Sequence, residues 1–123
     1  MHVPRIVTEQ PGEKLWVVAL EGEHDLSTAQ GLRRECDRIF ELGTCLVVDL
    51  TSATFIDSSI LRELVESQRR ADSEEGEGFA VVAPAGSAAA KVFEMVGARE
   101  ILAIFPTRAE AVEWCRGSEA TTA

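Results

Sequence analysis

The sequence lacks the segments that carry a protein into or across a membrane. None of its apolar stretches approaches the roughly 20 residues that a helix needs to span a bilayer. The residues from Met1 to Arg5 contain no apolar region of the signal-peptide kind. We therefore expect a cytoplasmic location and no membrane partner.

Residue types that carry catalysis or bind metals are also scarce. The only histidines are His2 and His24, and the three cysteines, Cys36, Cys45 and Cys115, show no metal-ligand spacing. The sequence has neither a Gly-x-Ser-x-Gly elbow nor a Walker loop. We therefore expect no enzymatic activity, no metal and no cofactor. The cysteines are interpreted as small buried thiols, and His24 as a solvent-facing loop residue.

Positive charge is in the minority. The 123 residues contain 12 Lys and Arg against 21 Asp and Glu, which gives a net charge of −9. This balance argues against a nucleic-acid partner, and it favours either simple solubility or a partner with a basic face. The length and an apolar content of 46% predict one globular domain. We place the domain at residues 1–116 and expect residues 117–123 to form a flexible tail.

A hairpin is predicted at the beginning of the chain, followed by alternating strands and helices. Pro11-Gly12 is a strong turn signal between strands at 5–9 and 14–21, and a tight turn makes such strands antiparallel. Further strands are predicted at 45–50, 79–83 and 101–104, and helices at about 26–41, 58–71 and 87–96 and after residue 107. This order predicts an α/β fold with a mostly parallel sheet, an N-terminal antiparallel edge strand and about four helices.

Short polar residues mark the predicted helix starts. Ser27 and Gln30 fit a capping box for the first helix, Ser87 caps the third, and Thr107 begins a second capping box. Gly97 is placed to end the third helix.

Two polar loops follow neighbouring strands of the predicted sheet. One is Gly22-Glu23-His24-Asp25, and the other covers residues 51–58. Because sites gather at the carboxyl ends of parallel strands, Asp25 and the pair Asp57-Ser58 are expected to share one edge. Ser58 lies at a helix start, where unpaired N–H groups and the helix dipole favour a phosphate.

The stretch from Val47 to Leu61 with its Asp57-Ser58-Ser59 motif resembles the signature of STAS domains of the anti-sigma-factor-antagonist type. The segment Gly22-Glu23-His24-Asp25-Leu26 resembles a second motif of that family, and the resemblance covers about residues 5–116. It implies a protein that binds an anti-sigma factor with serine kinase activity and is switched off when that kinase phosphorylates Ser58. It also implies that Asp25 helps to position Ser58 or the nucleotide.

The resemblance places Asp57, Ser59 and Ile60 around the phosphorylation site, in the partner contact. Ile60 departs from the family, which usually has Gly at this position. A branched side chain there could narrow the choice of kinase, block phosphorylation or pack into the partner interface. For a working antagonist we expect Ile60 to be at least partly exposed, and the competing interpretation is burial in the protein's own core.

Other interpretations stay open at the level of the sequence. Ser58 could serve only as the N-cap of its helix, with Asp57 shaping the loop. A STAS-like domain without phosphorylation could act as a scaffold or bind a small ligand. A receiver-like domain would use Asp49 as phosphoacceptor, with Glu21 and Glu23 as its acidic pair, but residues 104–107 supply no lysine.

Overall fold

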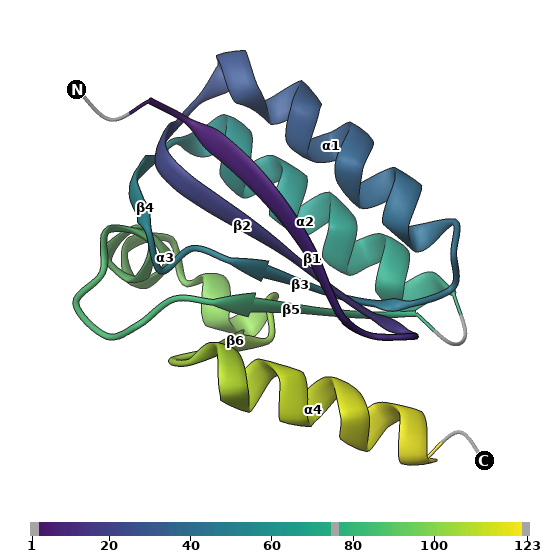
Figure 1. Ribbon diagram of the computed structural model, residues 1–123. Helices are drawn as coiled ribbons and strands as arrows, with labels where there is room; N and C mark the ends of the chain where they lie inside the picture. Colours follow the sequence, from purple (N-terminus) through teal and green to yellow (C-terminus); the bar gives the residue numbers. More distant parts are fainter. Residues whose placement is uncertain (1–2, 75–76, 122–123) are drawn as a thin grey trace.

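The computed structural model describes residues 3–74 and 77–121 as one mixed sheet flanked by helices (Figure 1). The elements in chain order are β1 Arg5–Gly12, β2 Leu15–His24, α1 Leu26–Phe40, β3 Cys45–Asp49, β4 Ala53–Ile56, α2 Ser58–Ser73, β5 Gly78–Val82, α3 Ala88–Val96, a 3₁₀ turn Ala98–Glu100, β6 Ile104–Phe105 and α4 Arg108–Thr121.

The strand order of the sheet is β1-β2-β3-β5-β6, and β4 pairs with the far end of β2. Only β1 and β2 are antiparallel; the remaining pairs are parallel. Helices α1 and α2 cover one face of the sheet and α4 lies on the other, while α3 lies beside β4 (Figure 1). The predicted fold class is confirmed.

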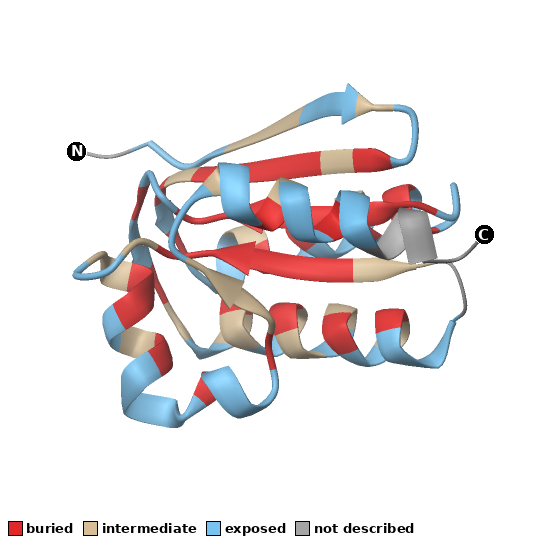
Figure 2. Ribbon diagram, turned by 90° about the horizontal axis from the view of Figure 1, so that it is seen from below, coloured by how far each residue is buried: buried red, intermediate tan, exposed pale blue. Residues whose placement is uncertain are grey.

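The core has two layers because the central strands are covered on both faces. Every residue of β3 is buried, which explains why its first four residues are all apolar rather than alternating with polar ones. The larger layer lies between the sheet and helices α1, α2 and α3, and the smaller one lies under α4. Figure 2 shows the central strands buried and the helices exposed on their outer sides.

The hairpin forms as predicted, but its turn lies two residues later. Gly12 pairs with Leu15, so Glu13 and Lys14 make the turn. Pro11 instead lies in β1, where the pairing is irregular between Glu9 and Gly12. Because β1 is an edge strand, a residue without an N–H is tolerated there.

Two predicted boundaries were wrong at the carboxyl edge of the sheet. Residues 22–24 continue β2 instead of forming a loop, because β4 pairs with them. Strand β4 was not predicted at all: it is four residues long, and its partner is distant in sequence. The last strand is Ile104–Phe105 rather than residues 101–104.

The interpretation of the cysteines was right for Cys36 and wrong for the other two. Cys36 is a free thiol in the larger core layer, and burial raises its pKa to about 12. Cys45 and Cys115 form a disulfide that joins β3 to α4. They are 70 residues apart in sequence, and only the packing of α4 on the sheet brings them together.

Helix α4 continues to Thr121, beyond the point where the tail was predicted to begin. Residues 122–123 of that tail lie outside the described residues, and its flexibility stays a prediction. No helix within the described ranges combines the length and the apolar character needed to cross a membrane.

Candidate functional site

Two helices begin side by side at the carboxyl edge of the sheet. Strand β2 pairs with β4 so that His24 lies opposite Ile56, and the next residues are Asp25 and Asp57. Each of these aspartates is the N-cap of the helix that follows, α1 or α2. The expectation that Asp25 and Asp57 share one edge is therefore confirmed.

Asp57, and not Ser58, caps helix α2. Its Oδ1 accepts hydrogen bonds from the backbone N–H of Ser59 at 2.9 Å and of Ile60 at 3.2 Å. Ser58 is the first residue inside the helix and is exposed. Within the part of the chain that the structure describes, its hydroxyl makes no hydrogen bond. The interpretation of Ser58 as a helix cap was wrong, and its hydroxyl is accessible for chemistry.

Asp25 holds the start of α1 in a similar way. Its Oδ1 accepts from the Ser27 backbone N–H at 2.9 Å and from the Ser27 hydroxyl at 2.6 Å. These hydrogen bonds stabilise the carboxylate and lower the pKa of Asp25. The capping box involves Asp25 and Thr28, so the predicted box of Ser27 and Gln30 was wrong.

His24 is fully buried, which corrects its interpretation as a solvent-facing residue. Its Nε2 lies 2.9 Å from the carbonyl oxygen of Glu21, and its Nδ1 lies 3.0 Å from the Thr28 hydroxyl. Because a carbonyl can only accept, Nε2 carries a proton and donates it. His24 thus ties the end of β2 to the first turn of α1 and fixes the position of Asp25 between them.

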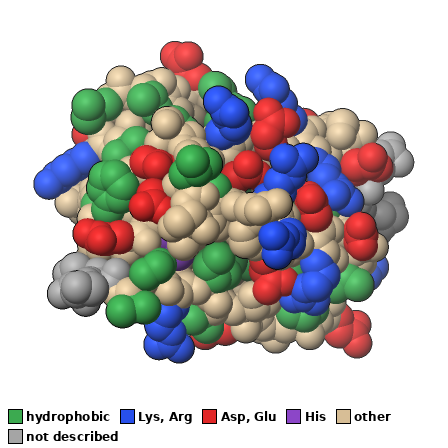
Figure 3. Space-filling view, turned by 90° about the horizontal axis from the view of Figure 1, so that it is seen from above, with side chains coloured by type: hydrophobic (Ala, Val, Ile, Leu, Met, Phe, Trp, Pro, Cys, Tyr) green, Lys and Arg blue, Asp and Glu red, His purple; other side chains and the backbone are tan. Residues whose placement is uncertain are grey.

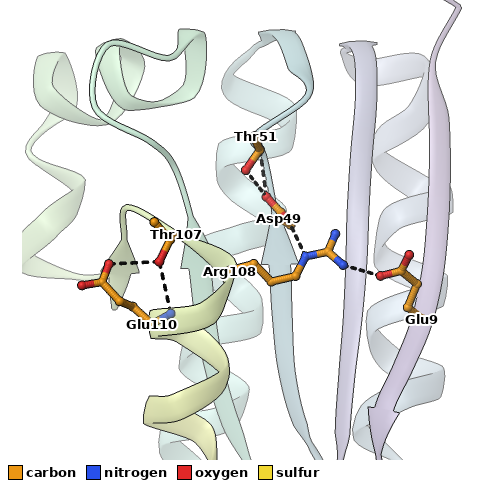
Figure 4. A network of polar contacts seen from close by, with 6 residues as sticks. All are labelled: Glu9, Asp49, Thr51, Thr107, Arg108 and Glu110. Carbon is orange, nitrogen blue, oxygen red and sulfur yellow. Dashed lines mark hydrogen bonds and ion pairs between the residues drawn. The ribbon is translucent and has the colours of Figure 1, made fainter.

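The loop that leads from β3 to this edge is fixed from the α4 side of the sheet (Figure 4). Asp49 Oδ1 accepts from the Thr51 backbone N–H and hydroxyl, at 2.9 and 2.6 Å. Its other oxygen accepts from Arg108 Nε at 2.8 Å, and Arg108 also forms an ion pair with Glu9. Burial lowers the pKa of Arg108, but the hydrogen bonds to Asp49 and Glu9 outweigh it and raise that pKa.

The environment of Asp49 bears on the receiver-like alternative. Asp49 is 6% exposed, and its carboxylate is occupied on both oxygens by Thr51 and Arg108. A phosphoacceptor carboxylate must be open to its phosphodonor, and this one is closed. Asp49 is a structural anchor for the loop between β3 and β4.

Two exposed apolar side chains flank the candidate site. Leu26 is 75% exposed at the start of α1, and Phe55 is 48% exposed in β4. A groove of about 570 Å³ extends from Leu26 along α1 and is bounded across from it by Glu63 of α2. Apolar side chains gather over this end of the two helices, whereas basic side chains, interleaved with acidic ones, lie mostly over the other end (Figure 3).

Sequence reasoning did not assign Leu26 and Phe55 to the site. Leu26 belongs to the quoted Gly-Glu-x-Asp-Leu segment, and that was the available signal. Phe55 gave no signal, because β4 was taken for a loop.

Comparison with known proteins identifies the family of this chain. A model of the STAS domain family matches residues 5–111. This chain is a member of the STAS domain family. A comparison with curated proteins found no match.

Several solved structures share the STAS fold of this chain. An anti-sigma factor antagonist from Mycobacterium paratuberculosis has 25% identity and a TM-score of 0.82, over 93% of this chain and 95% of its own. SpoIIAA from Bacillus, in its phosphorylated form, has 20% identity and a TM-score of 0.67, over 89% and 97%. A STAS domain protein from Planctomyces limnophilus, named an anti-sigma-factor antagonist, has 15% identity and a TM-score of 0.72, over 92% and 97%. The last two likenesses show the fold alone.

Ile60, which departs from the family motif, is completely buried in the larger core layer of this STAS domain. The expectation that its side chain is partly exposed and contacts a partner was therefore wrong. Residue 60 is in the first turn of α2 on the side that faces the sheet, so its side chain packs inward. Ser59 is half-buried and Ser58 is exposed, which leaves the hydroxyl of Ser58 unobstructed by Ile60.

Proposed function

We propose that this STAS domain is an anti-sigma factor antagonist of the cytoplasm, that it binds an anti-sigma factor with serine kinase activity, and that phosphorylation of Ser58 by that kinase releases it. The domain acts as a binding module and kinase substrate, with no catalysis of its own. One observation carries the proposal: the Ser58 hydroxyl is exposed at the start of α2, while Asp57 performs the capping that would otherwise occupy it.

The comparisons support this assignment at the level of the family. The Mycobacterium paratuberculosis protein is named an anti-sigma factor antagonist, and SpoIIAA has been solved in a phosphorylated form. Those names belong to those proteins. For this chain they support the expectation that a domain of this fold is phosphorylated.

The surface around Ser58 suits a protein partner. Leu26 and Phe55 supply exposed apolar area on either side of the two helix starts. Apolar side chains at the centre of a contact and charged groups around it are typical of protein–protein interfaces. Glu23 and Asp25 are exposed beside them and would form an acidic rim that suits a basic face on the partner.

Phosphorylation of Ser58 would disrupt this contact for a simple electrostatic reason. A phosphate adds about −1.5 to −2 charges. The N–H groups of Ser59 and Ile60, which could have neutralised it, already donate to Asp57. The phosphate would therefore lie beside the carboxylate of Asp57 and near that of Asp25, and placing it in a closed interface costs several kcal/mol through desolvation and repulsion.

A kinase assay with two serine variants tests the proposal. We expect Ser58→Ala to lose phosphate incorporation from labelled ATP and to keep partner binding, whereas Ser59→Ala is still phosphorylated. Peptide mass spectrometry then locates the modified residue. Incorporation that persists in Ser58→Ala and maps to Ser59 or Thr54 would contradict the assignment. A complete absence of incorporation in the wild-type chain would favour the scaffold or ligand-binding alternative.

A binding measurement tests the second half of the proposal, the release of the partner. Ser58→Glu is expected to weaken partner affinity at least tenfold, which corresponds to about 1.4 kcal/mol. Ser73→Glu adds the same charge on an exposed residue at the other end of α2 and serves as the matched control. Titration calorimetry that gives equal affinities for the two variants would place the contact elsewhere.

A further inference from the structure

The disulfide between Cys45 and Cys115 connects the centre of the sheet to the helix that covers its second face. Cys45 is the first residue of β3, and Cys115 lies in α4, with 6.0 Å between their Cα atoms. Both side chains are buried in the smaller core layer. Cys36 lies in the other layer, across the sheet, so it is not positioned to compete for either partner.

Gly78 makes the space that the Cys45 sulfur occupies. Strand β5 places Gly78 directly beside Cys45, and a Cβ atom at residue 78 would lie 2.9 Å from the Cys45 Sγ. Real Cβ atoms essentially never approach a neighbour so closely, so any larger residue would displace the sulfur. Three elements, β3, β5 and α4, therefore form a specific site for the bonded sulfur pair.

Apart from this bond, α4 contacts the sheet through a small number of apolar side chains. Among its described side chains, Ala111 and Cys115 are the ones that are fully buried, and Val112 is half-buried. At its first residue, Arg108 is held by Asp49 and Glu9. The middle of the helix is held by Ala111, Val112, the sulfur of Cys115 and the Trp114 ring, which packs against Phe105 of β6 with 5.6 Å between the ring centroids. The sulfur is thus one of a small number of attachments, and its state affects how firmly the helix is held.

We propose that Cys45 and Cys115 are a reversible thiol–disulfide modification site, oxidised by a small disulfide of the glutathione class, and that oxidation determines how firmly α4 is held on the sheet. The proposal is independent of the phosphorylation of Ser58.

The exchange is balanced without any further reactant. Both sulfurs are buried, so exchange takes place when α4 opens locally from the sheet. The exposed Cys115 thiol then loses its proton, and its sulfur attacks glutathione disulfide, breaking that S–S bond and releasing one glutathione thiolate. The Cys45 thiolate then attacks the Cys115 sulfur of the mixed disulfide and releases the second glutathione. Two protein thiols are oxidised, one disulfide is reduced to two thiols, and the two protons pass to the leaving thiolates. Reduction by excess glutathione or a dithiol is the reverse sequence.

The intact chain tests the proposal in glutathione buffers of graded oxidation. We expect alkylation and mass spectrometry to show Cys45 linked to Cys115 in oxidising buffer, both alkylated in reducing buffer, and full return between the two states while the protein stays folded. Hydrogen exchange of the α4 amides should be at least tenfold faster in the reduced state. The melting temperature should be higher in the oxidised state by about 10 °C, since the bond closes a long loop.

Matched variants separate the site from general thiol effects. Cys36→Ser should leave the response unchanged, and Cys115→Ser should abolish it; if Cys115→Ser fails to fold, the reduced wild-type chain replaces it. Gly78→Ala should lower the equilibrium constant for the linkage at least tenfold, whereas Gly31→Ala, whose new Cβ meets only an ordinary contact with Ile6, should not change it.

Three results would overturn the proposal. One is that both cysteines stay alkylated in every buffer. Another is that the linkage resists reduction until the protein unfolds. The third is that α4 exchanges at equal rates in the oxidised and reduced states.

Discussion

Ile60 departs from the family motif at a residue whose side chain lies in the protein's own core. The side chain is completely buried beneath the exposed Ser58 and fills space between α2 and the sheet. The difference from the usual Gly therefore concerns the interior packing of this protein. Ser58 is exposed although its neighbour two residues on is a branched side chain and not glycine.

We expect Ile60→Gly to destabilise the fold by about 4 kcal/mol, from the cavity it leaves and the flexibility of glycine in a helix. Ser59→Gly introduces the same flexibility at the half-buried neighbour and should cost about 1 kcal/mol or less. Urea unfolding measures both. If Ile60→Gly lowers the free energy of unfolding only slightly but greatly weakens partner binding, residue 60 contacts the partner and the core assignment is wrong.

The carboxylate of Asp25 gives a prediction about pH. Hydrogen bonds from the Ser27 hydroxyl and backbone hold its pKa below the ordinary 3.8. A lowered folded-state pKa means that the stabilisation is complete above the unfolded value and is lost as the pH falls through the folded value. NMR titration should show this low pKa in the wild type and a rise toward 3.8 in Ser27→Ala. Ser73→Ala, at the far end of α2, should leave it unchanged.

At the scale of elements, the site depends on how β4 and α4 meet the sheet. Strand β4 pairs with the end of β2 and thereby sets the two helix starts next to each other. The turn before β4 is held by Asp49, which in turn is held by Arg108 at the start of α4. The edge that carries Ser58 is thus supported from the opposite face of the sheet.

Arg108→Gln is expected to lower the free energy of unfolding by about 1–2 kcal/mol, since it leaves the buried Asp49 carboxylate without its charged partner and the pair is partly screened by solvent. Glu9→Gln, on the more exposed arm of the same network, should cost less than about 0.5 kcal/mol. In a double-mutant cycle with Asp49→Asn, chemical denaturation should give a coupling near 1 kcal/mol. If the losses in unfolding free energy of the two single variants simply add up in the double variant, Arg108 and Asp49 do not stabilise the fold through each other.

At the scale of the whole molecule, charge is distributed unevenly. The net charge is −9, yet six of the twelve basic residues lie in α1 and α2, as Arg33, Arg34, Arg38, Arg62, Arg69 and Arg70. Figure 3 shows most basic side chains on this face away from the helix starts. The candidate site, with exposed Glu23 and Asp25, therefore lies where basic side chains are few, and a basic partner would be steered toward it.

We expect the association rate with the partner to fall about tenfold between 0.05 and 0.5 M salt, as steering is screened. Glu23→Gln removes a charge at the site and should slow association about twofold. Glu113→Gln removes the same charge on α4, across the sheet, and should have a smaller effect. Stopped-flow measurements giving equal rates for both variants would mean that net charge, and not local charge, governs the encounter.

Local signals were enough for much of the fold. Ser87 and Gly97 mark the two ends of α3 as predicted, with Gly97 at a φ of 67° that suits glycine. Helices α1 and α2 begin near the predicted residues 26 and 58, although the cap of α1 is Asp25 and not the predicted Ser27. The cap of α2 was misplaced by one residue, because aspartate and serine are about equally good caps and stand side by side here. Periodicity and capping act over a few residues, so the sequence expresses them directly.

The sequence by itself determined the strand and helix order, the α/β class and the pair of motifs that place Asp25 and Ser58 at one edge. Only the tertiary structure decided that β4 extends β2, that His24 and Ile60 are buried, and that Cys45 reaches Cys115 across 70 residues. The physical reason is the range of the interactions. A cap or a periodic face is set by neighbours three or four residues away, whereas burial and cross-links depend on which distant surfaces pack together. The sequence of a short strand or of a single side chain does not indicate which distant residues it will contact.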